Sequence, residues 1–257
     1  TGAFNFVTGQ TRSNDYAITV TSNSYPVTVQ FGAISVQGIG VWSTYGSSSV
    51  TFNVDSITAS SPLLSDSIFY TGAPSYISAS NIKIKDYDNT AIAAVANSTW
   101  TATNSITISR SLSLPPTSGH SAIQSQYGSM VLQAGVGFSV STHVRSDSGG
   151  GALRISSGAS LGIAAARIQF LGNSASTGGA IWNDGTLNLQ AATSISFDLN
   201  NASNSHGGAL YSSNNNFTLN STSITFNGNS AVFYGGAVSV PSGSAEKFIN
   251  VNFLSNT

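Results

Sequence analysis

Short runs of alternating apolar and polar residues recur along the whole chain. Apolar side chains occupy every second position in segments such as 27–29, 34–36 and 50–52, with polar residues between them. Strict alternation is typical of a β-strand that buries one face and exposes the other. The pattern therefore predicts an all-β protein built from many short strands.

Pairs of the form aliphatic-x-apolar return at a nearly regular interval. Their first members are separated by 23, 25, 24, 30, 32, 27, 29 and 27 residues, and they are Ile34, Ile57, Ile82, Ile106, Val136, Ile168, Ile195, Ile224 and Val251. A repeat this short cannot bury its own apolar face, so it must stack on its neighbours. The interval predicts a single right-handed parallel β-helix, a solenoid of about nine coils and roughly 43 Å in length.

Two further motifs share this interval in the second half of the chain. Gly-Gly-Ala-aliphatic units supply the glycine pairs Gly150 and Gly151, Gly178 and Gly179, Gly207 and Gly208, Gly235 and Gly236. Phe-x-x-Asn units supply Phe170 and Asn173, Phe197 and Asn200, Phe226 and Asn229, Phe253 and Asn256. We expect the Phe side chains to stack inside the coils and the Asn side chains to bond one another at a corner. The glycine pairs suit a second corner that needs positive φ or a close backbone approach.

The two halves of the chain differ in regularity. Residues 1–147 predict irregular coils with loop excursions at 60–75 and 109–129, whereas 148–257 predict regular coils continuous with the first part. Extra residues in a coil become loops on one flank, and such loops often carry binding. The first excursion is unusually apolar, so it either covers a flank or contacts a partner, through Leu63, Leu64, Ile68, Phe69 and Tyr70.

The composition excludes several classes of function. The chain has 8 Lys+Arg against 9 Asp+Glu, and charged residues make up 7% of it, against about 25% in an average soluble domain. No basic surplus is available for nucleic acid. The absence of Cys excludes thiolate metal sites and disulfides. No apolar stretch reaches the length of about 18 residues that a membrane-spanning helix needs.

Catalytic chemistry has weak support in the sequence. Enzymes of the β-helix type that cleave acidic polysaccharides gather carboxylates on adjacent coils. The best such cluster here is a single segment with two carboxylates, which we expect to be a solvated strand face ending in a turn: Lys83, Lys85, Asp86, Tyr87 and Asp88. The sequence therefore predicts no catalytic residues, no metal site and no cofactor.

Histidine residues, tryptophan residues and glycosylation sequons are the remaining candidates for ligand contacts or modification. His120, His143 and His206 stand in unrelated contexts, which argues against a three-histidine metal site. Three Trp side chains could stack on sugars, although packing in the core or along a flank is the stronger expectation; they are Trp42, Trp100 and Trp182. Glycosylation sequons occur at Asn97, Asn201, Asn216 and Asn220, and they matter only in a host that glycosylates.

The paired motifs resemble a known family. Phe-x-x-Asn units that alternate with Gly-Gly-Ala-(Ile/Leu/Val) units are similar to the chlamydial polymorphic outer membrane protein repeat, over about residues 148–257. The resemblance implies a passenger-like β-helix of an autotransporter, which acts as an adhesin at the cell surface.

Three functions follow as hypotheses. The first is a non-enzymatic extracellular or cell-surface β-helix that serves as an adhesive or structural element and binds a surface receptor or a glycan. The second is a self-assembling subunit of a filament or coat. No polar cap is visible after Asn256, so the strand edges of that coil are expected to be open, and further coils or further copies of the chain would stack on them end to end. The third is a polysaccharide lyase or hydrolase of the β-helix type.

Overall fold

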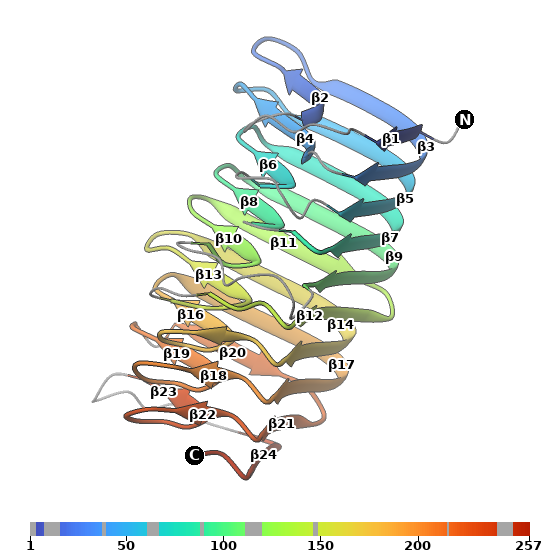
Figure 1. Cartoon of the computed structure of the whole chain (residues 1–257). Helices are drawn as coiled ribbons and strands as arrows, with labels where there is room; N and C mark the ends of the chain where they lie inside the picture. The colour runs from blue at the N-terminus through green and yellow to red at the C-terminus, as the bar shows by residue number, and fades with distance from the viewer. Residues whose placement is uncertain are drawn as a thin grey trace.

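The chain winds into a stack of coils whose strands run parallel from coil to coil (Figure 1). The computed structural model describes residues 4–7, 16–37, 40–60, 67–87, 90–110, 120–145, 149–214, 216–240 and 249–257. Within these ranges, every regular element is a β-strand. The structure thus confirms the predicted all-β parallel solenoid.

The longest sheet follows the solenoid axis from one end to the other. Its strands pair in the order β1 (Phe4–Val7), β3 (Val27–Gln37), β5 (Val50–Ser60), β7 (Ser75–Lys85), β9 (Ser98–Ser109), β11 (Ser129–Ala134), β14 (Ser160–Leu171), β17 (Thr186–Asp198), β21 (Ile224–Asn227) and β24 (Val251–Leu254). Two more strands pair with this path, β12 (Gly137–Ser141) and β20 (Phe217–Asn220). The sheet is therefore continuous across both halves of the chain.

Two smaller sheets close the coils. The second sheet contains β2 (Tyr16–Thr21), β4 (Gly40–Tyr45), β6 (Phe69–Thr71), β8 (Ile92–Ala94), β10 (Ile123–Ser125), β13 (Leu153–Ile155), β16 (Ile181–Asn183), β19 (Leu210–Ser212) and β23 (Val238–Ser239). The third sheet lies only in the regular half and contains β15 (Ser174–Ala175), β18 (Asn201–Ala202) and β22 (Ser230–Ala231). The chain passes once through the second sheet in each coil.

The strand register corrects one of the nine predicted pairs. Phe138 lies beside Ile106 in one neighbouring coil and beside Ile168 in the other, so the buried pair of this coil begins at Phe138 rather than at Val136. Val136 precedes β12 and its side chain is 62% exposed. Val136 lies in the break between β11 and β12, where the chain passes from one strand to the next, so its side chain is exposed although its spacing matches that of the buried positions.

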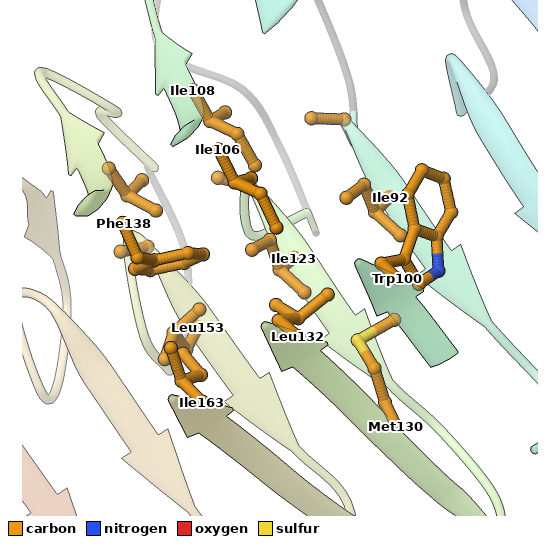
Figure 2. Packing of buried hydrophobic residues seen from close by; sticks show 14 of the residues in the cluster. Ile92, Trp100, Ile106, Ile108, Ile123, Met130, Leu132, Phe138, Leu153 and Ile163 are labelled. Atoms are coloured by element: carbon orange, nitrogen blue, oxygen red, sulfur yellow. The ribbon is translucent and has the colours of Figure 1, made fainter. Parts of the chain in front are cut away.

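Apolar side chains from the facing sheets fill the interior. Figure 2 shows Trp100, Ile123 and Leu132, from β9, β10 and β11, meeting in this core. In the first half, the core contains an aromatic cluster, where the ring of Trp42 lies 4.3 Å from that of Phe52 and 5.8 Å from that of Trp100. Trp42 and Trp100 are fully buried, so neither is available to a ligand.

Each of the two expected excursions contains a short strand of the second sheet. Strand β6 lies inside 60–75 and strand β10 lies inside 109–129, each paired in register with the second sheet. Alternation could not reveal these strands, because both are three residues long. Ile68 and Phe69 are fully buried in the core, so of the two expected roles, covering a flank or contacting a partner, these two side chains fit the first. Leu63 and Leu64 lie outside the described residues, and Tyr70 is half-buried.

Candidate functional site

Asn173, Asn200, Asn229 and Asn256 form a ladder of hydrogen bonds along the solenoid axis. The Oδ1 atom of Asn200 accepts the backbone N–H of Asn173 at 3.0 Å and its Nδ2–H at 3.1 Å. The Nδ2 of Asn200 also donates to the carbonyl of Phe170 at 3.1 Å. Asn229 and Asn256 repeat both interactions one and two coils further on. The ladder satisfies polar groups that the corner would otherwise bury without partners.

Phe170, Phe197, Phe226 and Phe253 stack inside the same coils. Successive ring centroids are 5.0, 4.6 and 5.2 Å apart, and the planes of each pair lie within 15° of parallel. The first three rings are fully buried, whereas Phe253 is 50% exposed. The stack and the Asn ladder together hold consecutive coils in one register.

The Asn ladder continues into the irregular half through a residue of another type. His143 occupies the rung before Asn173, and its backbone N–H donates to Asn173 Oδ1 at 3.2 Å. Its Nε2 lies 3.0 Å from the carbonyl oxygen of His120, and its Nδ1 lies 2.9 Å from the hydroxyl of Tyr87. A carbonyl only accepts, so the neutral ring donates from Nε2 and accepts the Tyr87 proton at Nδ1. This cluster was not predicted from the sequence, because His120 and His143 stand in unrelated sequence contexts.

Burial sets the protonation state of this polar cluster. His143 and Tyr87 are both buried. Loss of solvent lowers the pKa of His143 to about 3 from its ordinary 6.5, and it raises the pKa of the Tyr87 phenol. Both groups are therefore neutral at physiological pH, and the cluster acts as a hydrogen-bonded element of the core.

Two buried arginines hold the backbone around the same cluster. Arg110 Nε donates to the carbonyl of Tyr87 at 2.9 Å. Arg145 Nη1 donates to the hydroxyl of Ser121 at 2.9 Å and to the carbonyl of Gly149 at 2.7 Å. The bond from Arg145 to Gly149 attaches the irregular coils to the residue before the first glycine pair of the regular half, and the bond from Arg110 joins two irregular coils.

The glycine pairs form the second corner, as backbone geometry requires. The first glycine of each pair has a φ between 59° and 68°, in Gly150, Gly178, Gly207 and Gly235. The second glycine faces the next coil, because a Cβ on Gly179 would lie 2.2 Å from the carbonyl oxygen of Gly208. Any larger residue would strain the first position and separate the coils at the second.

The residues of the best carboxylate segment do not converge. Lys83 and Lys85 are exposed on the outer face of β7, whereas Tyr87 is buried in the core. Asp86 lies at the turn between them with a φ of 45°, and Asp88 lies outside the described residues. In the described part of the chain, no three His, Asp or Glu side chains gather where they could hold a metal ion.

A strip of planar side chains lies on the outer surface beside the glycine corner. We define this aromatic strip as Arg154, Trp182, His206, Tyr211, Phe233 and Tyr234. Arg154, Trp182 and Tyr211 are register partners on β13, β16 and β19, at the outward position that follows each buried aliphatic residue. The Arg154 guanidinium lies 4.4 Å from the centre of the Trp182 ring system. Arg154, Trp182 and Tyr211 each follow a Gly-Gly-Ala-aliphatic motif directly in the sequence, whereas Ser239 takes this position after the fourth copy.

The other three residues of the strip lie at the glycine corner. His206 lies in the coil of Tyr211, and Phe233 and Tyr234 lie in the next coil. The His206 ring lies 5.3 Å from the Tyr234 ring, at 15° between planes, and 5.8 Å from the Phe233 ring. Gly178 joins the two parts, because its amide donates to the His206 carbonyl at 2.9 Å and a Cβ on it would lie 3.1 Å from Tyr211 Cβ. The residues of the strip therefore lie on consecutive coils beside the glycine corner.

The comparisons with known proteins agree with the repeat geometry. The Chlamydia polymorphic membrane protein repeat matches residues 167–184 and 223–241. Each matched segment runs from a Phe-x-x-Asn corner through a glycine corner. Comparison with curated proteins and with solved structures finds no match. The chain is a parallel β-solenoid whose second half carries repeats similar to those of the Chlamydia protein family.

Among the described residues, no helix has the length and apolar character needed to cross a bilayer.

Proposed function

We propose that the chain is a non-enzymatic, surface-exposed β-solenoid that serves as an adhesive or structural element outside the cell. The observation that supports this proposal is the match of a membrane-protein repeat to the coils that build the Phe and Asn ladders. The matched residues serve the internal stacking of the rod, so they leave its outer faces available for binding.

The chemistry of the outer surface agrees with such a role. Solubility rests on Ser, Thr, Asn and Gln side chains, since only 7% of the residues are charged. A weakly charged rod with hydroxyl and amide groups on its faces can contact cell-surface molecules without strong dependence on salt. Internal ladders keep the rod rigid, which lowers the entropic cost of binding through its faces.

Surface labelling of the source cells tests the location. Antibodies raised against the purified 257-residue chain are applied to intact and to permeabilised cells, with an antibody against a cytoplasmic protein as the control. Labelling of intact cells, removed by an external protease, is the expected result. Labelling that requires permeabilisation would refute the proposed location.

Incubation with polysaccharides tests the non-enzymatic part. The purified chain is mixed with uronic-acid-containing and neutral polysaccharides, and reducing ends are measured over time. We expect no cleavage above a boiled control. Cleavage by the chain that is lost in the variant Asp86→Asn would instead support the lyase or hydrolase hypothesis.

A further inference from the structure

Three consecutive apolar residues are exposed between β22 and the fourth glycine pair. We define this apolar loop as Val232, Phe233 and Tyr234, whose side chains are 60%, 64% and 74% exposed. The loop carries no charged residue. Exposed apolar side chains that adjoin one another mark a contact site for another protein or for a membrane.

The corner itself does not require apolar residues at these positions. Val232 takes the place of Ser203 in the preceding coil, because the amide of each donates to the alanine carbonyl one coil earlier, at 3.3 and 2.8 Å. Tyr234 takes the place of His206, because the carbonyl of each accepts the amide of a glycine one coil earlier, at 3.0 and 2.9 Å. Ser203 and Asn204 are exposed although a further coil stacks on theirs. The position therefore faces solvent in a covered coil too, and only the apolar loop fills it with apolar side chains.

Stacking and backbone bonds hold the apolar loop in one shape. The rings of Tyr234 and His206 lie 5.3 Å apart at 15° between planes, and the ring of Phe233 lies 5.8 Å from that of His206. The amide of Phe233 donates to the carbonyl of Ser205 at 3.2 Å. A loop fixed in this way loses little conformational entropy when it enters a binding partner.

We propose that the apolar loop inserts into the interfacial region of a lipid bilayer and attaches the solenoid to a membrane surface. This inference rests on the proposed function as an element outside the cell and names a partner for it. Aromatic rings favour the boundary between lipid headgroups and acyl chains. The hydroxyl and amide groups of Ser203 and Asn204, in the coil beside the loop, suit the polar headgroup layer.

Size and charge favour a bilayer over a macromolecular partner. A buried aromatic side chain contributes about 150–250 Å², so two partly exposed rings and a valine supply about half of the roughly 800 Å² that each partner buries in a stable protein interface. Binding to a bilayer has no such minimum, because its strength scales with the apolar area inserted. No Lys or Arg stands between Arg167 and Lys247, so these coils offer no cation to a nucleic acid or an acidic protein.

Vesicle flotation with the purified full chain tests the proposal. The chain is mixed with vesicles of phosphatidylcholine alone and with vesicles that also contain phosphatidylserine, each at low and at high salt. We expect the chain to float with both kinds of vesicle and to a similar extent at both salt concentrations. The reason is that the loop inserts through apolar contact, whereas binding through charge is screened by salt.

A loop exchange provides the matched variant. Val232→Ser, Phe233→Asn and Tyr234→His together give the loop residue types that the preceding coil carries, so we expect the chain to fold, which the urea midpoint checks. The partition coefficient should fall about tenfold or more, because the apolar area is lost. Tyr25→Ser removes a side chain that is 80% exposed between β2 and β3, and it should leave the partition coefficient unchanged.

A fluorescent label reports the contact at the loop directly. The chain has no Cys, so Val232→Cys provides a single thiol for nitrobenzoxadiazole, whose emission shifts to the blue in apolar surroundings. We expect this shift when phosphatidylcholine vesicles are added. The same label on Tyr25→Cys should show no shift.

Four outcomes would overturn the proposal. They are an absence of flotation with both kinds of vesicle, flotation that the loop exchange leaves within twofold, and flotation that requires phosphatidylserine and disappears at high salt. The fourth is a dimer in sedimentation velocity that the loop exchange abolishes, which would assign the apolar loop to a second copy of the chain. All these measurements use purified chain, so their failure leaves the labelling result for cell-surface location unaffected.

Discussion

Replacing Asn200 with Ala removes one rung from the middle of the Asn ladder. The side chain of Asn200 is fully buried, and it hydrogen-bonds Asn173 and Phe170 in the coil before it and Asn229 in the coil after it. Its loss leaves the backbone N–H of Asn173 without an acceptor and the carbonyl of Phe170 without this donor. It also removes the acceptor of one amide proton on Asn173. All these groups lie at a corner that the stacked coils close to solvent.

The expected cost follows from the number of polar groups that lose a partner. A buried donor or acceptor without a partner costs about 1–3 kcal/mol. Two backbone groups and part of one side chain then give a loss of about 3–6 kcal/mol in the free energy of unfolding. Because each coil of a solenoid contacts only its neighbours, the defect is local to the coils of Phe170, Asn200 and Asn229.

Urea unfolding followed by circular dichroism measures the total loss, and hydrogen exchange measures the local one. We expect the amide of Asn173 to exchange faster in Asn200→Ala. The control Asn227→Ala removes an exposed Asn one coil away, and it should change the free energy of unfolding by less than about 0.5 kcal/mol. If Asn200→Ala is as stable as this control and the Asn173 amide keeps its protection, the Asn ladder does not contribute the expected stability.

Other substitutions test the remaining elements by thermal or urea unfolding. Gly178→Ala should lower the free energy of unfolding by about 2–4 kcal/mol, because the φ of Gly178 is 59° and the new Cβ would meet backbone atoms. The control Gly162→Ala should be close to neutral, because its Cβ would meet open space. Equal effects of the two substitutions would refute the role given to the glycine corner. Phe197→Ala should cost about 3–5 kcal/mol by opening the stack between two parallel rings, and a loss below 1 kcal/mol would count against it. The pKa of His143 is about 3 in the folded chain, against its ordinary 6.5 in the unfolded chain. As the pH falls below 6.5, the unfolded chain therefore binds the proton first. The free energy of unfolding then decreases by up to about 1.4 kcal/mol per pH unit. Between pH 7 and pH 5.5, His143→Asn should lose less of its free energy of unfolding than the parent chain. An equal loss in both chains would refute the assignment of this pH dependence to His143.

The sequence by itself determined the architecture. Alternation over two residues shows which face of a strand is buried, and its return every 23 to 32 residues requires stacking, since one coil cannot cover its own apolar face. The Phe-x-x-Asn and Gly-Gly motifs also identified the residues that form two corners of each regular coil. These features depend on local geometry, namely strand alternation, positive φ and amide bonding, and such geometry repeats visibly along a chain.

Only the tertiary structure decided which residues outside the motifs act together. His143 takes the rung before Asn173, and its coil has Val140 and His143 where the later coils have the Phe and Asn of the motif. Tyr87 reaches it from two coils away, across a separation of 56 residues. Trp182 faces outward while Trp42 is buried, because strand register sets the side on which each indole lies. Contacts between coils join residues that are distant in sequence, and irregular coil lengths hide those pairings until the coils are stacked.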